Sequence, residues 1–278
     1  MEMIQLNNGV EMPILGFGTY QITDHNECVR SVKDALTTGY RLIDTAAAYG
    51  NEEYVGQAVK ESPVDRSDVF ITTKMWFKDF ENPEQAFEDS LTRLGVDYID
   101  LILLHWPFGN TYKAYRSLEK FLDQKLVRAI GVSNYTGSQL VDLIHFNNVT
   151  PAVNQIETNL LTQQKDMHKL MNEYQVQPQG YAPFGQGHAN EMFDNIDLIH
   201  IANKYVKSPR QIALKYFVQQ QIPVVPKSTH INRIKENFDI FDFKLTKEEL
   251  SQIAAMDTNT PLIGNPQNPE KAKTAMTW

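Results

Sequence analysis

Short apolar runs rich in β-branched residues alternate along this chain with longer segments of helical periodicity. An apolar run of about four to eight residues, bounded by polar or turn-forming residues, is typical of a buried strand. Eight runs fit this description: Ile14–Phe17, Tyr40–Ile43, Val69–Thr73, Ile99–Leu104, Val127–Val132, Ala152–Ile156, Gln177–Tyr181 and Ile222–Val225. Strands that alternate with helices favour a parallel sheet, and eight such units predict a closed α/β fold, the (β/α)8 TIM barrel.

Helix-start signals stand between these runs. Asn82-Pro83 and Ser208-Pro209 each place a capping residue before a proline that suits the first helical position. Thr246 and Glu249 have the spacing of a capping box, which predicts the start of the last helix.

The two ends of the chain carry different signals. Asn7-Asn-Gly9 between two short apolar runs predicts an N-terminal β-hairpin. Residues 258–269 are rich in Asn, Thr and Pro, so an irregular C-terminal tail is expected. The tail either frays or lies over the barrel mouth with Trp278 near a pocket, and the sequence leaves both open.

Composition narrows the possible partners and compartment. The 278 residues show no linker, so residues 1–278 are predicted to form one domain, and a monomer is expected. A net charge of -8 disfavours a nucleic-acid partner. No apolar run approaches the roughly 20 residues that cross a bilayer, so no membrane association is expected. The single cysteine, Cys28, cannot form an internal disulfide, which favours a cytoplasmic location.

Four reactive side chains follow or end the predicted strands: Asp44, Tyr49, Lys74 and His105. In a closed parallel barrel the carboxyl ends of the strands share one mouth, so these four are predicted to converge there. Taken singly, each has an ordinary structural explanation, such as a surface ion pair or packing. Together they form a proton-donating site suited to carbonyl reduction.

The expected division of roles follows from charge. An ammonium about 4 Å from a phenol is worth roughly 4 kcal/mol at an intermediate dielectric, so Lys74 is expected to lower the pKa of Tyr49 towards neutrality. Asp44 is expected to hold Lys74 charged and in place. A neutral His105 is expected to orient the carbonyl oxygen by a hydrogen bond.

Motifs along the whole chain also resemble a known family. They are Gly16–Thr19, Arg41–Ala46, Tyr49–Glu52, Thr72–Lys74, His105–Pro107, Ile130–Asn134, Asn154–Glu157, Tyr181–Gly185, Val225–Ser228 and Arg233–Asn237. In this order they resemble the aldo-keto reductases, and the short loops look most similar to the bacterial branch that includes 2,5-diketogluconate and methylglyoxal reductases. The resemblance implies an NADP-dependent oxidoreductase that converts aldehydes and ketones to alcohols.

The cofactor prediction combines exclusion with this resemblance. The chain lacks the Gly-x-Gly-x-x-Gly fingerprint and any zinc-binding histidine pattern, so no Rossmann site and no metal are expected. The resemblance implies that the nicotinamide ring stacks on Tyr181. It assigns further cofactor contacts to Gly18, Thr19, Ser133, Asn134, Gln155 and Phe184.

A basic segment near the end of the chain bears on cofactor choice. Lys227, Ser228 and Arg233 near a helix start can hold a phosphate, and the resemblance assigns them the 2′-phosphate of NADPH. Glu236 and Asn237 match positions that contact the adenine. NADPH is therefore predicted over NADH.

The substrate is expected to be a small carbonyl compound. Tyr20, Trp76 and Trp106, with His105, are predicted to line an aromatic pocket. The segments after Pro107 and Gly187 look short, which predicts an open pocket and broad specificity.

The chain also departs from the family. Thr158–Leu161 replaces a His-Pro turn, and Ala182 replaces a serine.

Three other functions compete with carbonyl reduction. A short-chain dehydrogenase would need Lys four residues after a Tyr, which the chain lacks, and a metal-dependent barrel hydrolase is disfavoured by the histidine spacing. A catalytically weak redox-sensing or structural protein of the same fold stays open, although the intact four residues argue against it.

Overall fold

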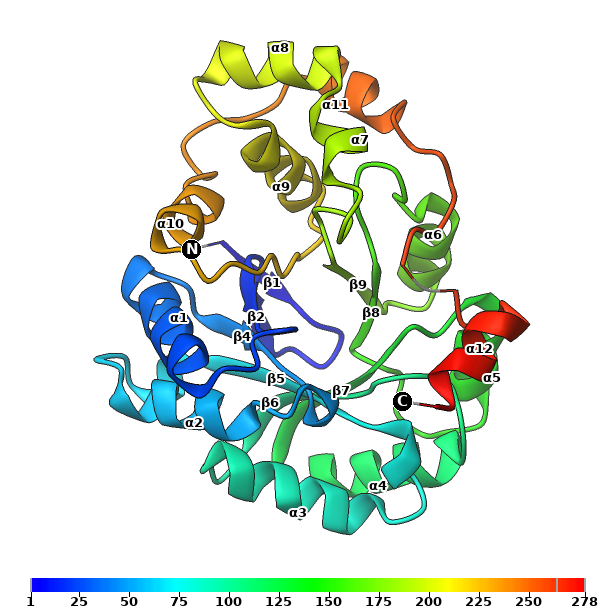
Figure 1. Cartoon of the computed structure of the whole chain (residues 1–278). Coiled ribbons are helices and arrows are strands. Elements are labelled where there is room, and N and C mark those ends of the chain that lie inside the picture. Colours follow the sequence, from blue (N-terminus) through cyan, green and yellow to red (C-terminus); the bar gives the residue numbers. More distant parts are fainter. Residues whose placement is uncertain (1, 264, 278) are drawn as a thin grey trace.

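The computed structural model of this chain describes residues 2–263 and 265–277. Seven parallel strands succeed one another around a barrel in chain order, each paired with its neighbour, and helices enclose them (Figure 1). These strands are β3 (Gly16–Gly18), β4 (Leu42–Asp44), β5 (Phe70–Met75), β6 (Ile99–Leu104), β7 (Val127–Ser133), β8 (Val153–Glu157) and β9 (Gln177–Tyr181). They begin and end within a few residues of the predicted runs.

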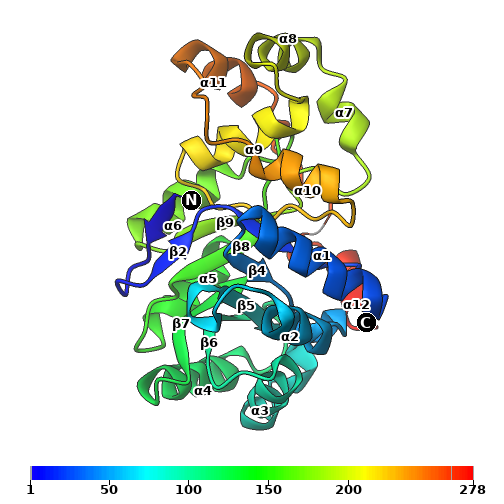
Figure 2. The ribbon, with the colours of Figure 1, turned by 90° about the vertical axis from the view of Figure 1, so that its left-hand side faces the viewer.

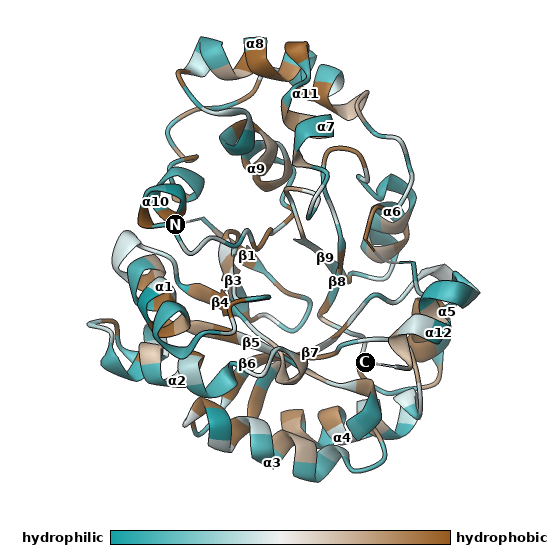
Figure 3. Ribbon diagram, in the orientation of Figure 1, coloured by the Kyte–Doolittle hydropathy of each residue, from teal (hydrophilic) through white to brown (hydrophobic). Residues whose placement is uncertain are grey.

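The helices form the outer layer. They are α1 (His25–Thr38), α2 (Glu52–Glu61), α3 (Pro83–Leu94), α4 (Thr111–Asp123), α5 (Gly137–His145), α6 (Lys165–Glu173), α7 (Ala189–Phe193), α8 (Ile196–Tyr205), α9 (Pro209–Gln219), α10 (Ile231–Phe238), α11 (Lys247–Ala254) and α12 (Pro269–Ala275). Short 3₁₀ turns are η1 (Ala47–Tyr49), η2 (Arg66–Asp68) and η3 (Phe77–Asp79). Nearly all residues of the seven barrel strands are buried, polar ones included, whereas the helices alternate apolar and polar positions, as Figure 3 shows.

The predicted helix starts are confirmed. Asn82 precedes α3 with proline at its first turn, and Ser208 caps α9 through a full capping box with Gln211. Thr246 accepts a hydrogen bond from the backbone N–H of Glu249 and so begins α11 as predicted.

The eighth strand is where the prediction needs correction. Residues 222–225 form no regular strand, and Val224 makes single parallel bridges to Leu15 on one side and Gly180 on the other. The reason is that Pro223 and Pro226 stand on either side of Val224 and Val225. Proline has no backbone N–H, so neither proline can donate a hydrogen bond to a regular ladder. The barrel nevertheless closes, because the backbone N–H of Gly16 donates to the carbonyl of Val224 at 2.9 Å.

The predicted hairpin is confirmed and lies at one end of the barrel. Strands β1 (Met3–Gln5) and β2 (Glu11–Pro13) pair antiparallel, with Gly9 in the left-handed region at φ 84°. The Asn7 amide donates to the carbonyl of Pro151, which fastens the turn to the barrel. Figure 2 shows this hairpin and α12 at opposite ends of the barrel, so the strands' carboxyl ends open away from the hairpin.

One expectation about a loop was wrong. The segment after Gly187 is not short, because it contains α7 and α8 before α9 begins. The tail forms no helix or strand over residues 258–263 and 265–268, as expected. The side chain of Asn268 then caps α12 through the backbone N–H groups of Glu270 and Lys271. The expected place of Trp278 near a pocket lies outside the described residues.

Candidate active site

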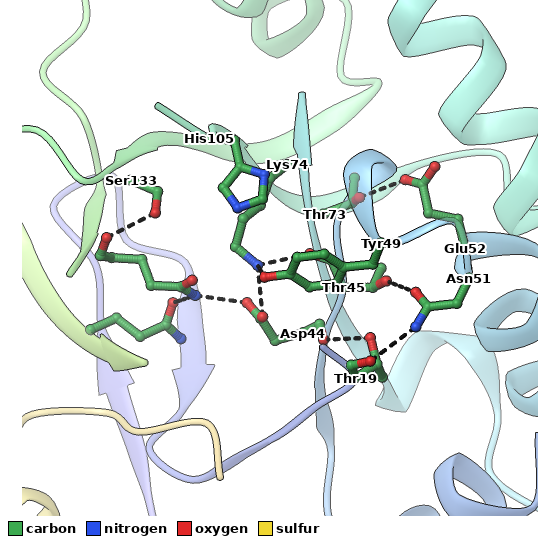
Figure 4. A network of polar contacts seen from close by, with 12 residues as sticks. Thr19, Asp44, Thr45, Tyr49, Asn51, Glu52, Thr73, Lys74, His105 and Ser133 are labelled. Atoms are coloured by element: carbon green, nitrogen blue, oxygen red, sulfur yellow. Dashed lines mark hydrogen bonds and ion pairs between the residues drawn. The ribbon is translucent and has the colours of Figure 1, made fainter. Parts of the chain in front are cut away.

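The four predicted catalytic side chains meet at the carboxyl ends of neighbouring strands (Figure 4). Asp44 is the last residue of β4, Lys74 lies in β5, His105 follows β6, and Tyr49 ends η1. The Nζ of Lys74 donates to Oδ1 of Asp44 at 2.7 Å and to the carbonyl of Thr45 at 2.8 Å. It lies 3.4 Å from the hydroxyl of Tyr49.

Burial sets the protonation of this cluster. Lys74 is 1% exposed and Asp44 3%, so each charge depends on the other for compensation. Burial lowers the pKa of Lys74, while the carboxylate of Asp44 opposes that change. The ammonium is therefore retained by its ion pair rather than by water.

The expectation that Lys74 brings the pKa of Tyr49 towards neutrality was wrong for this structure. Burial raises the pKa of Tyr49 well above its ordinary value, and the carboxylate of Asp44 acts in the same direction. The physical reason is that Asp44 offsets the Lys74 charge, whereas desolvation penalises a phenolate directly. Tyr49 is thus held as a neutral hydroxyl, a form that can donate a proton.

His105 occupies the other side of the Tyr49 ring. The two ring centroids are 5.6 Å apart in an edge-on arrangement. Burial, with Lys74 as a second cause, lowers the pKa of His105 well below its ordinary value, which agrees with the expected neutral imidazole. Nδ1 of His105 is buried without a hydrogen-bond partner among the described residues. A neutral ring leaves His105 able to act as a hydrogen-bonding group without competing with the Lys74 charge.

Aromatic side chains surround these two rings. The Tyr20 ring lies 4.9 Å from that of Tyr49, and the Trp76 ring lies 5.3 Å from that of His105. These contacts place Tyr20 and Trp76 beside Tyr49 and His105, and their part in a substrate pocket stays a prediction. Trp106 stacks on Phe108, two positions further along the same loop, with the ring planes 4° apart.

The amide-bearing side chains assigned to the nicotinamide form a chain that leads into the cluster. Nδ2 of Asn134 donates to the carbonyl of His105 at 3.0 Å, and the Tyr181 hydroxyl donates to Oδ1 of Asn134 at 2.8 Å. Ser133 donates to the backbone carbonyl of Gln155 at 2.9 Å. The predicted carboxamide partners are therefore next to the predicted proton donors.

The turn after β3 is held against the carboxyl end of β4, where Asp44 lies. The backbone N–H of Thr19 donates to the carbonyl of Asp44 at 3.0 Å, and the Thr19 hydroxyl contacts that carbonyl too. At Gly18 an added Cβ would stand 2.9 Å from the carbonyl oxygen of Val225. A glycine is required there because the two backbone segments approach so closely.

The basic segment lies beside the start of α10. Ser228 is buried, and its Oγ accepts a hydrogen bond from the backbone N–H of His230 at 3.1 Å, while Lys227 and Arg233 are exposed. Cations and a hydroxyl at a helix N-terminus suit a phosphate group. The carboxylate of Glu236 accepts a short hydrogen bond from Ser208, the residue that caps α9, so Glu236 already has a partner within the protein.

Two further positions were predicted to contact the cofactor. Asn237 is buried on α10. Phe184 packs edge-on against Phe193 of α7, at 5.8 Å between ring centroids.

Sequence reasoning missed two buried polar residues at the barrel mouth. Gln179 contacts Gln155, and Glu157 accepts hydrogen bonds from the backbone N–H groups of Leu262 and Ile263. The available signal was strand register, because Gln155 and Gln179 are direct partners across β8 and β9. The contact of Glu157 with the tail joins residues more than a hundred positions apart, so no local sequence pattern predicts it.

The described residues contain neither a candidate metal site nor a membrane-spanning helix. Among residues 2–263 and 265–277, no group of three or more His, Cys, Asp or Glu side chains is placed to hold a metal ion. Over the same residues, no helix has the length and apolar character needed to span a membrane.

Comparisons with known proteins agree with this architecture. Residues 14–258 match the Aldo/keto reductase family. The methylglyoxal reductase DkgA of Escherichia coli (strain K12) is 40% identical over 95% of this chain and 96% of its own. An aldo-keto reductase from a Medee basin deep-sea metagenome library superposes with a TM-score of 0.93 at 39% identity, over 96% of this chain and 99% of its own. A Bombyx mori aldo-keto reductase in complex with NADP reaches 0.89 at 33% identity, over 95% of both chains. This chain therefore belongs to the aldo/keto reductase family.

Proposed function

We propose that this protein reduces small aldehydes and ketones to alcohols with NADPH, and that Tyr49 donates the proton. One observation carries the proposal: Nζ of Lys74 contacts both the Asp44 carboxylate and the Tyr49 hydroxyl at the mouth of the barrel. Carbonyl reduction needs a hydride at carbon and a proton at oxygen, and this cluster supplies the proton.

Tyr49 and Lys74 act together in proton donation. The raised pKa keeps the Tyr49 hydroxyl protonated before reaction, so the proton is available at neutral pH. As the proton leaves, negative charge develops on the phenolic oxygen next to the buried Lys74 ammonium. Lys74 therefore stabilises the charge of the transition state rather than that of the resting enzyme.

His105 positions the carbonyl. Its ring faces that of Tyr49 edge-on, and burial keeps the imidazole neutral. A neutral ring N–H can donate to the carbonyl oxygen and hold it within reach of the Tyr49 hydroxyl. Tyr20 and Trp76 provide apolar walls, which suit small carbonyl compounds without selecting one strictly.

The residues present fit a nicotinamide cofactor. The Tyr181 ring offers a flat stacking surface, and Asn134 and Gln155 offer amide groups beside the proton donors. Lys227, Ser228 and Arg233 offer a phosphate site beside α10. When bound, NADPH supplies the hydride. The NADP complex of the Bombyx mori relative supports the choice of NADPH over NADH.

Turnover of NADPH tests this proposal. The protein is expected to oxidise NADPH with methylglyoxal or a nitrobenzaldehyde, with kcat/KM at least about tenfold higher for NADPH than for NADH. Equal values for the two cofactors would contradict the NADPH assignment. Inactivity across several carbonyls would instead favour a redox-sensing or structural protein of the same fold.

Paired tyrosine variants test the donor. Tyr49→Phe should bind NADPH normally and lose at least about 100-fold in kcat, because a positioned acid contributes about 10² to 10⁴ in rate. Tyr54→Phe on α2 is the matched control, since its ring packs against His25 away from Lys74. Near-normal turnover by Tyr49→Phe would exclude Tyr49 as the donor.

A further inference from the structure

Two glutamines from adjacent strands continue the polar cluster across the barrel interior. Gln155 on β8 and Gln179 on β9 are direct partners in the strand register. Nε2 of Gln155 donates to Oδ2 of Asp44 at 2.7 Å and to Oε1 of Gln179 at 2.8 Å. Gln155 is 1% exposed and Gln179 is fully buried, so water does not compete for these bonds.

The hydrogen-bonding capacity of Gln155 explains what Gln179 does. A primary amide has two N–H donors, and in Gln155 both are used, one on Asp44 and one on Gln179. No donor among the described residues reaches Oε1 of Gln155. Because both N–H groups are engaged, the amide plane is fixed and Oε1 keeps its acceptor capacity for a ligand.

Without Gln179, the orientation of the Gln155 side-chain amide would be less well defined. The last torsion of a glutamine side chain is broad, so one bond to Asp44 leaves the amide free to rock. Among the described residues, the Gln179 side chain has no other strong contact, since its own Nε2 reaches only Sδ of Met12, at 4.0 Å. The main interaction of the Gln179 side chain is thus to hold Gln155.

We propose that Gln179 is a positioning residue for the reaction. Gln179 accepts a hydrogen bond from one N–H of the Gln155 amide, which keeps the second N–H directed at Asp44. Oε1 of Gln155 is then left to accept a hydrogen bond from the carboxamide N–H of the nicotinamide. One side chain that touches neither substrate nor cofactor then links the ion pair of Lys74 to the placement of the hydride donor. This inference rests on the proposed function.

Three variants of strand β9 test it. Gln179→Met removes the acceptor at similar size, and Gln179→Glu keeps an acceptor oxygen in the same place. Gln177→Met is the matched control, because Gln177 begins the same strand and its amide contacts the carbonyls of Pro178 and Gln221 instead. Circular dichroism and thermal unfolding establish that each variant is folded.

The first measurement does not depend on turnover. Side-chain amide resonances of Gln155 are identified by ¹⁵N NMR as the pair lost in Gln155→Met. In the parent both amide protons are expected to resist exchange with solvent. In Gln179→Met one of the two should lose protection, whereas Gln179→Glu and Gln177→Met should leave the pair as in the parent.

Binding and kinetics form the second measurement. In Gln179→Met, Kd for NADPH should rise about tenfold, the equivalent of about 1.4 kcal/mol for one hydrogen bond, and kcat should fall while KM for the carbonyl changes little. Gln179→Glu should recover NADPH affinity. If Gln179 had a merely structural role, both variants would unfold at a lower temperature. The separate effects on kcat and KM, and the recovery of NADPH affinity in Gln179→Glu, would then be missing.

Two outcomes would overturn the inference: unchanged Gln155 amide protection in Gln179→Met, or equal loss of NADPH affinity in the Met and Glu variants. Failure of the proposed function looks different, since the parent itself would then consume no NADPH. The NMR comparison would still decide whether Gln179 orients Gln155.

Discussion

Nζ of Lys74 lies 2.7 Å from Oδ1 of Asp44 and 3.4 Å from the Tyr49 hydroxyl, so one buried ammonium serves both a carboxylate and a phenol. Lys74→Met should therefore affect activity and stability at once. We expect kcat to fall at least about 100-fold. We expect the free energy of unfolding to fall by about 3–5 kcal/mol, because Asp44 is left charged, buried and unpaired. Steady-state kinetics and urea unfolding measure the two effects.

The double variant Asp44→Asn/Lys74→Met separates the effect on turnover from the effect on stability. Removing both charges should restore most of the stability, since no uncompensated charge remains in the barrel. Turnover should stay low, because the developing phenolate still lacks a cation. Recovery of turnover together with stability would show that Lys74 has only a structural role.

Cofactor preference should depend on the exposed cations beside α10. We expect Arg233→Ala to raise KM for NADPH about tenfold, since one charge-assisted hydrogen bond contributes roughly 1.5 kcal/mol, and to leave KM for NADH within about twofold. Lys235→Ala on the same helix is the matched control, being exposed on α10 like Arg233. Equal effects on the two cofactors would contradict a 2′-phosphate site.

The tail should detach when Glu157 loses its charge. Glu157 is 2% exposed and accepts from the backbone N–H groups of Leu262 and Ile263, at 2.9 and 3.0 Å. Glu157→Gln places an NH₂ group where one acceptor oxygen stood. Thermolysin, which cleaves before such apolar residues, should therefore cut this segment several times faster, as followed by mass spectrometry. Exposed Glu173→Gln on α6 should cleave like the parent.

His168 should make the fold sensitive to acid. Burial lowers its pKa from 6.5 to about 4, with Asp257 acting in the opposite direction. Between these two values the unfolded chain binds a proton that the folded chain does not, so stability falls as pH decreases through this window and is unaffected above it. The loss is at most about 3 kcal/mol.

Thermal unfolding at pH 7.5 and 5.0 measures this effect. The parent should lose more stability than His168→Gln between the two pH values, because the variant cannot take up that proton. His145→Gln on α5 provides the control, since this histidine is on the exposed side of its helix and contacts Tyr174. Identical pH dependence in the parent and His168→Gln would show that His168 is not responsible.

Local sequence signals predicted the helix starts and most strands correctly because they depend on contacts within a few residues. Ser208 and Thr246 cap their helices with groups three positions away. The apolar run at 99–104 coincides with β6, since both faces of a parallel barrel strand are buried. The eighth strand failed for a similarly local reason, as Pro223 and Pro226 break its ladder.

Protonation could not be predicted in the same way. The sequence places an ammonium near Tyr49, and Coulomb attraction alone predicts a lowered pKa. The structure adds desolvation and the opposing Asp44 charge, and these dominate. Burial is a property of the packed barrel, so the direction of this pKa change depends on all the strands that exclude water from the mouth.

By itself, the sequence determined the order of strands and helices and the family, and it pointed to Asp44, Tyr49, Lys74 and His105, because periodicity and motifs are local. Only the tertiary structure decided how these residues are connected. Gln179 reaches Asp44 through Gln155, and Glu157 holds a tail over a hundred residues away, at sequence separations of 24, 111 and 105. Closure of the barrel brings these groups together and removes water, and neither effect is encoded in any short segment of the chain.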